Sequence, residues 1–206
     1  MRGHHEKNQT GYFAAFAVCL SSAIGIAFAA NLITFFVFFE LLTIATYPLV
    51  FHSRTDEAKF SGRKYLIYTL VSGQLFLVGI GIVYYLTGGN VDFAAGGILT
   101  ADMAPAGLLA ILFVMLIAGG AVKAGLMPIH GWLPSAMVAP TPVSALLHAV
   151  AVVKAGAFAV IRIIGYVFGP QLLAQLGAAE VLAWFAVATI LISSLIAMKQ
   201  DNLKRR

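Results

Sequence analysis

The organisation of the chain follows from residues 119–162, GGAVKAGLMPIHGWLPSAMVAPTPVSALLHAVAVVKAGAFAVIR, where lysine, histidine, glycine and proline interrupt otherwise apolar sequence. Lys123 lies near the end of one apolar run, and Lys154 lies well inside a second run that begins at Val143. A charged side chain at the centre of a bilayer costs about 2.5–3.5 kcal/mol on insertion scales, so such residues usually face a bundle interior or a wet cavity. We therefore expect function to reside in this stretch.

The first part of this stretch continues a helical pattern that extends over about 107–138. A helix of about 32 residues at about 1.5 Å each would be about 48 Å long, which exceeds the roughly 30 Å hydrocarbon core. Glycines and prolines follow Lys123 closely, and proline removes a backbone donor and clashes with the preceding turn. We predict a broken helix, with the break near 124–130. Broken helices at membrane depth occur where protein or water satisfies the free backbone groups, and in transporters they mark ion sites.

Composition indicates a polytopic membrane protein. Hydrophobic residues make up 61% of the 206 residues and charged residues 10%, whereas soluble domains are about 25% charged. The net charge of +5 is explained by topology rather than by nucleic-acid binding, because ten of the thirteen Lys and Arg residues lie in three short segments between or beyond apolar runs.

Cys19 is interpreted as a packing residue. No spaced metal-ligand set or nucleotide-binding motif occurs, so we expect no metal and no cofactor.

Hydropathy predicts an all-α membrane protein with six transmembrane helices, one of them broken. The expected helices are about 12–30, 32–51, 65–86, 107–138 with its break, 143–166 and 179–198. Basic residues gather in the N-terminal segment, in the connection 52–64 and in the C-terminal tail, whereas the other two long connections carry none. The positive-inside rule then places both termini in the cytoplasm, as in a multi-pass cell-membrane protein. We find no signal peptide, and the chain ends on LKRR, so we expect a fragment of a longer protein.

Glu40 is a third ionisable residue at membrane depth, near the middle of the span 32–51. A nearby lysine would keep its carboxylate ionised, whereas an unpaired carboxylate would be neutralised. Its helix face also carries Phe36, Thr43 and Tyr47, a mixture that suits a bundle interior. The alternative interpretation is a static ion pair that fixes helix packing.

The span 143–166 combines several polar side chains on different faces. Ser144 and His148 share a face, while Lys154 lies about 9 Å further along a regular helix and roughly 120° around it, so water would have to join the two. Arg162 lies toward the external end, where it is either a snorkelling anchor or a functional group.

Three motifs, in order along the chain, resemble one family. Residues 123–156, KAGLMPIHGWLPSAMVAPTPVSALLHAVAVVKAG, resemble the signature of the antiporter-like membrane subunits of multisubunit monovalent cation/proton antiporters, NADH:quinone oxidoreductase (complex I) and membrane-bound hydrogenases. Residues 31–50 resemble the family's glutamate-bearing helix, and KQDNLKRR resembles its loop after the ninth helix. Members have about fourteen helices with two inverted five-helix repeats. By this comparison, residues 1–206 form a single partial domain similar to helices four to nine: one repeat plus one helix.

The resemblance implies roles for individual residues. Glu40 matches the glutamate that pairs with the lysine of the broken helix, and Lys123 matches that lysine. His148 and Lys154 match the histidine and lysine that continue the hydrated path in the next helix. The accessory candidates are His130, Ser144 and Arg162. Parts of the signature are similar to complex I subunits, whereas the stretch HHEKNQTGYF and the overall pattern favour the D-type subunit of the cation antiporters.

These residues predict a proton-translocating subunit of a multisubunit monovalent cation/proton antiporter. Burial disfavours a charged lysine and a carboxylate favours it, so forming and breaking a Glu40–Lys123 pair would switch Lys123 between holding and releasing a proton. A histidine, whose unperturbed pKa is about 6.5, suits the relay toward Lys154. The expected partners are other subunits of a membrane complex, the lipid bilayer, protons and Na⁺ or K⁺.

Three alternatives stay open at this point. The chain could be a proton-pumping subunit of NADH:quinone oxidoreductase or of a membrane-bound hydrogenase. It could be a structural membrane subunit without transport, although a scaffold does not need three charges at membrane depth. It could also be a redox subunit in which His130 and His148, or His52, ligate haem.

Overall fold

A computed structural model describes residues 9–52 and 55–202 of the chain. Within these ranges the chain is helical and forms no strand, apart from an isolated bridge between Asn31 and Asp92. Six helical segments are long and apolar enough to cross a membrane. They are Gln9–Phe28, Leu32–Val50, Asp56–Leu86, Ala106–Ala124, Thr141–Phe168 and Ala178–Met198. This confirms the predicted all-α membrane fold.

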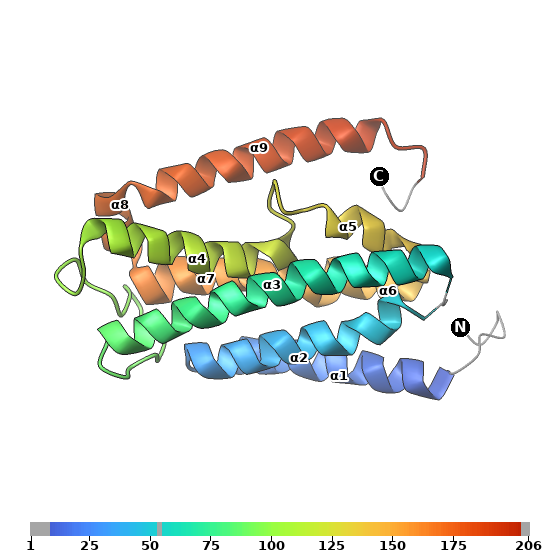
Figure 1. The fold of residues 1–206 in the computed structure, drawn as a ribbon, viewed down its shortest axis with the longest axis horizontal. Helices are drawn as coiled ribbons and strands as arrows, with labels where there is room; N and C mark the ends of the chain where they lie inside the picture. The colour runs from blue at the N-terminus through green and yellow to red at the C-terminus, as the bar shows by residue number, and fades with distance from the viewer. Residues whose placement is uncertain (1–8, 53–54, 203–206) are drawn as a thin grey trace.

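The helices form an elongated bundle in which sequence neighbours pack side by side (Figure 1). The main elements are α1 (Gln9–Phe28), α2 (Leu32–Val50), α3 (Asp56–Leu86), α4 (Ala106–Ala124), α7 (Val152–Arg162) and α9 (Ala178–Met198). The α1–α2 hairpin turns at Asn31, whose side chain caps α2 by accepting a hydrogen bond from the Thr34 N–H at 2.8 Å. α3 packs between α2 and α4, and α4 packs against α7. α9 runs along the outside of the bundle and has no buried residue.

The largest difference from the predicted spans is at the start of α3. We expected this helix to begin at about residue 65, but it begins at Asp56. Thr55 caps it by accepting the Ala58 N–H at 3.2 Å, and two acidic residues in the first turn complement the helix dipole. Hydropathy finds only the apolar part of such a helix. The α1 helix also lies slightly earlier than predicted, at 9–28 rather than 12–30.

The predicted span 143–166 is a composite rather than one regular helix. It starts as α6 (Thr141–Ala145), passes through a π-helical segment, η3 (Leu146–Val150), continues as α7 and ends in a second π-helical segment, η4 (Ile163–Phe168). The Ala151 N–H donates to the Leu146 carbonyl at 2.8 Å, five residues back. The short α8 (Pro170–Leu176) then precedes α9. Leu146–Val150 contains no glycine or proline, so its sequence did not indicate a π-helical turn.

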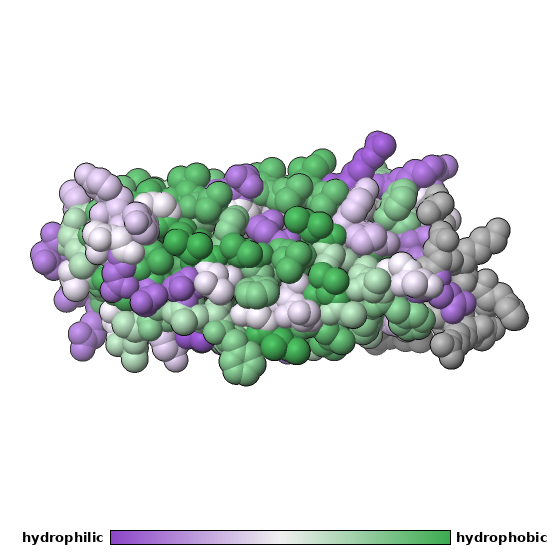
Figure 2. All heavy atoms as spheres, turned by 90° about the horizontal axis from the view of Figure 1, so that it is seen from below, coloured by the Kyte–Doolittle hydropathy of each residue, from purple (hydrophilic) through white to green (hydrophobic). Residues whose placement is uncertain are grey.

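The surface is arranged as a membrane protein requires. On the face in Figure 2, hydrophobic side chains cover the middle of the bundle and hydrophilic ones gather toward its ends. The starts of α1 and α3 and the end of α9 lie at the same end of the bundle (Figure 1). That end carries the basic residues of the first α3 turns, and Lys199 directly follows α9. The other residues used for the predicted orientation lie outside the described ranges: Arg2, Lys7, Arg54, Lys204, Arg205 and Arg206.

Candidate functional site

The broken helix ends at Ala124, one residue after Lys123. Gly125 adopts a left-handed conformation, with φ of 79°, and terminates α4. Residues 125–131 contain no regular helix, and helical structure resumes in the short α5 (Trp132–Ser135), which leads into a 3₁₀ turn. The chain thus has the broken helix that its sequence predicts, immediately beside the buried lysine.

Side chains from distant parts of the chain satisfy backbone groups at the break. The fully buried Trp132 donates its Nε1–H to the Val122 carbonyl, near the end of α4, at 2.7 Å. The Met127 N–H donates to the Thr189 hydroxyl of α9 at 3.1 Å. These bonds meet the requirement that irregular backbone at membrane depth be satisfied by protein. Sequence analysis missed Trp132 and Thr189, because their partners are backbone groups that are freed only by the break.

The structure brings Lys123 and Glu40 together inside the bundle. The Lys123 side chain is fully buried, and its Nζ lies 3.6 Å from Glu40 Oε1. The same ammonium donates a hydrogen bond to the Phe39 carbonyl and lies 3.3 Å from the centroid of the Phe39 ring. A ring face at this distance also favours a cation. Three groups of α2 therefore surround the charge at the end of α4, which agrees with the predicted approach of the two residues.

Glu40 occupies a narrow space against α3. Its side chain is 15% exposed, and Oε1 has no hydrogen-bond partner among the described residues. A Cβ atom at Gly73 of α3 would lie 2.7 Å from that oxygen, so the carboxylate fits because position 73 lacks a side chain. Sequence analysis did not identify this glycine, since nothing local in the α3 sequence shows which helix it faces.

His130 and His148 line one cavity of about 470 Å³, called the polar cavity here because two histidines and three hydroxyl-bearing residues lie among its otherwise apolar walls. It lies between the broken segment, the π-helical η3 and α9, and its walls include the hydroxyl-bearing Thr189 and Ser193 and residues Ala124 and Gly125. Neither His130 Nδ1 nor His148 Nε2 has a hydrogen-bond partner in the described part of the chain. The wall of the cavity therefore includes Ala124, the residue after Lys123, and two histidines that each have one ring nitrogen without a partner among the described residues.

The structure does not gather all of the candidate residues. Ser144 is buried and donates to the Ala139 carbonyl at 3.3 Å, a contact within its own segment. Lys154 is exposed on α7 and has no ion-pair partner among the residues described. It is also absent from the walls of the histidine cavity. In the described part of the chain, no ion pair and no shared cavity joins Lys154 to Glu40, Lys123 or the two histidines.

Arg162 lies in a cage of aromatic rings. Its guanidinium carbon is 4.7 Å from the ring centroid of Phe93, 4.9 Å from that of Phe158 and 4.8 Å from that of Tyr166. Phe93 belongs to the long connection between α3 and α4, so these cation–π contacts fasten that connection to the end of α7. This arrangement favours the anchor interpretation of Arg162.

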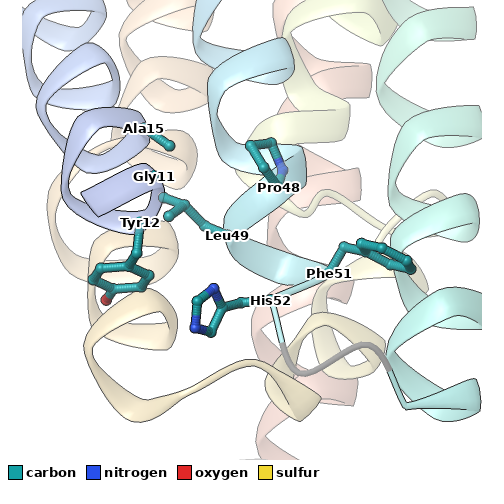
Figure 3. A pocket seen from close by; sticks show the side chains of 7 residues that line it. All are labelled: Gly11, Tyr12, Ala15, Pro48, Leu49, Phe51 and His52. Atoms are coloured by element: carbon teal, nitrogen blue, oxygen red, sulfur yellow. The ribbon is translucent and has the colours of Figure 1, made fainter. Parts of the chain in front are cut away.

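His52 does not line the cavity of His130 and His148. It lines a separate cavity of about 290 Å³ at the end of α2, where its ring packs edge-on against Tyr12 with centroids 5.3 Å apart (Figure 3). Among the described residues, no group of three or more His, Cys, Asp or Glu side chains is placed to hold a metal ion.

Comparisons with known proteins identify the family to which the chain is similar. Residues 29–206 match the family model described as NADH:quinone oxidoreductase/Mrp antiporter, TM. The NAD(P)H-quinone oxidoreductase chain 5 of Picosynechococcus sp. is 33% identical over 98% of this chain and 30% of that protein. The D-type subunit of the Na(+)/H(+) antiporter of Bacillus subtilis is 24% identical over 97% of this chain and 40% of its own length.

A solved structure is also similar. A chain of the membrane-bound sulfane sulfur reductase, an archaeal respiratory membrane complex, superposes with a TM-score of 0.84 at 30% identity, over 94% of this chain and 39% of that one. The present chain thus spans less than half the length of each of these proteins. Because the family model covers most of the sequence, the chain belongs to the NADH:quinone oxidoreductase/Mrp antiporter transmembrane family.

Proposed function

We propose that the chain translocates protons as part of a multisubunit membrane complex of the complex I and Mrp antiporter superfamily. One observation carries the proposal: a fully buried lysine at the end of a broken helix, with a glutamate carboxylate 3.6 Å away. A buried lysine is a poor structural element, because the cost of desolvating its charge can exceed what one partner returns. It is a good proton carrier, because its ammonium can lose a proton when its environment changes.

The ion pair acts as a switch in this mechanism. While Glu40 is near, its negative charge favours the protonated form of Lys123. The Phe39 carbonyl and ring add to that preference. When the carboxylate moves away, desolvation dominates and Lys123 releases its proton.

The histidine cavity is the next part of the path. Its volume of about 470 Å³ accommodates several water molecules, each of which occupies about 30 Å³ in the liquid. Water there would bridge the region beyond Lys123 to His130 and His148, whose imidazoles both accept and donate protons. Lys154 is proposed as the acceptor after His148, and its exposed position means that other parts of the complex would complete this step. Ser144 is proposed as an accessory residue of the path.

More specifically, we propose that the parent complex is a multisubunit monovalent cation/proton antiporter and that this chain corresponds to its D-type subunit. The named relatives include an Na(+)/H(+) antiporter subunit, which supports this type, and a quinone oxidoreductase chain, which supports the alternative. Dependence of proton movement on Na⁺ or K⁺ supports the antiporter type. Dependence on quinone reduction favours the oxidoreductase type. The proposed location is the cell membrane, with both termini in the cytoplasm and the remaining subunits as partners.

The test is proton transport by the intact parent complex in membrane vesicles. Lys123→Ala should abolish formation of a pH gradient, because the site at which the proton rests is gone. Lys199→Ala is the matched control, since this exposed lysine lies just outside α9. Native gels establish that each variant assembles. Normal transport by an assembled Lys123→Ala complex would reject the proposal and favour a structural subunit.

A further inference from the structure

The broken segment lines two cavities that differ in their polar side chains. One is the polar cavity with His130 and His148. The other is a cavity of about 390 Å³ with apolar walls from α4, residues 126–129 and the α8–α9 region, including Phe113 and Phe185. Met127 lines both cavities and is itself buried. Met127 is therefore the residue at which the two cavities adjoin.

One long-range hydrogen bond fixes the backbone of Met127. Its N–H donates to Thr189 Oγ1 at 3.1 Å, and the same hydroxyl donates to the Phe185 carbonyl at 2.7 Å. Thr189 thus uses its oxygen as an acceptor across the interface and its proton within α9. The two residues are 62 positions apart. Because α9 buries no residue of its own, this bond is a specific tie between α9 and the break.

A hydroxyl on α9 does not bond to the broken segment merely because it lines the polar cavity, as a second hydroxyl of this helix shows. Ser193 lies one turn further along α9 and also lines the cavity. Its hydroxyl donates to the Thr189 carbonyl at 2.5 Å and to the Ile190 carbonyl at 3.3 Å, both in its own helix. Without the Thr189 hydroxyl, Met127 would keep a backbone donor with no helical acceptor, since α4 has already ended at Ala124.

We propose that Thr189 is a positioning residue that holds residues 125–129 against α9, so that Met127 seals the polar cavity from the apolar one. This inference rests on the proposed function in one respect, namely that the polar cavity carries protons. The seal keeps water beside His130 and His148 and keeps apolar chains out. It also fixes the segment that begins two residues beyond Lys123, and so the direction in which the proton leaves.

The experiment uses the parent complex in membranes and two readouts, hydrogen exchange of the Met127 amide by mass spectrometry and proton transport. Thr189→Val keeps the branched shape but removes the hydroxyl, and should accelerate exchange at Met127 about tenfold and lower transport roughly threefold. Thr189→Ser retains the hydroxyl and should restore both readouts. Ser193→Ala is the control for exchange alone and should leave the Met127 rate unchanged.

The outcomes separate this inference from the proposed function. Unchanged exchange in Thr189→Val would overturn the tie, whatever happens to transport. Accelerated exchange with normal transport would overturn the seal, because the bond would then have no bearing on the path. Normal transport in the Lys123→Ala complex would instead reject the proposed function, and the exchange result for Thr189 would stand independently of it. Faster exchange, slower transport and rescue by serine together support the inference.

Discussion

Lys123 and Lys154 are both lysines within membrane-spanning segments, yet the structure gives them opposite surroundings. Lys123 is fully buried at a helix end, with a carboxylate 3.6 Å away and a carbonyl as a further partner. Lys154 lies in the regular helix α7, exposed and with no ion-pair partner in the described ranges. A charge at membrane depth is therefore not enough to identify a proton site. Partners and a place at a helix break distinguish the first lysine from the second.

The helix end has its own electrostatic consequence. The last turn of α4 carries Lys123, and the C-terminal end of a helix favours cations because its unpaired carbonyls give it partial negative charge. Lys154 has no such position, because α7 continues a helical span that runs from Thr141 to Phe168. The backbone thus favours a cation at Lys123 before any side chain is considered.

The largest effect should come from Lys123→Arg, which keeps the charge but removes the ability to lose a proton. We expect proton transport to fall at least about a hundredfold, the range associated with losing a proton-transfer group. The measurement is pH-gradient formation in vesicles, with assembly checked on native gels. Normal transport by the Lys123→Arg variant would show that Lys123 does not release a proton, and Lys123 would then be no better a candidate proton site than Lys154.

Lys154→Ala should have the next largest effect, a reduction in transport of about tenfold, because a later acceptor in the path is lost. The assay is the same, with Lys154→Arg as the matched variant. Loss in both variants shows that position 154 must release a proton. Full activity of Lys154→Ala would sharpen the contrast instead, since Lys154 would then serve only at the surface.

Glu40→Gln should reduce transport about fivefold while preserving the shape of the side chain in its space beside Gly73. The amide cannot supply the negative charge that favours protonated Lys123. The rate of proton transport and its dependence on external pH should both be recorded. If the glutamine variant behaves as the unmodified complex, the buried pair has a packing role and Lys123 works without it.

The smallest effect should come from Arg162→Lys, which retains a cation for the three aromatic rings. Transport should stay within about twofold, since a cation–π contact contributes only about 0.5–2 kcal/mol and lysine replaces part of it. Arg162→Ala should lower the thermal stability of the complex more than Arg162→Lys does. A severe transport defect in the assembled lysine variant would place Arg162 in the path with Lys123.

The features that could be predicted from the sequence alone are those encoded by a local pattern of residues. Apolar runs located the six spans, and the excess length of 107–138 with its glycines and prolines located the break. The approach of Glu40 to Lys123 followed from their charge and from the resemblance to a known family. In each case the prediction rested on one stretch of sequence, or on the need of a charged side chain at membrane depth for a partner of opposite charge.

The features that sequence analysis missed depend on tertiary contacts. Thr189 matters because a backbone N–H freed 62 residues earlier meets it. Gly73 matters because a carboxylate from another helix fills its space. The early start of α3 depends on a cap at Thr55, and hydropathy does not register caps. Neither the partner of Thr189 nor that of Gly73 is close in sequence, so no local period or composition could reveal them.

The π-helical segment Leu146–Val150 changes the phase of everything that follows it. A turn of π-helix closes five residues back rather than four, so it contains one residue more than an α-helical turn. One extra residue corresponds to about 100° of rotation around a helix with 3.6 residues per turn. A helical wheel drawn through this span therefore assigns the wrong face to every position after Val150, Lys154 included. Deleting one residue from the segment would turn α7 by about that angle and present a different set of its side chains to α4.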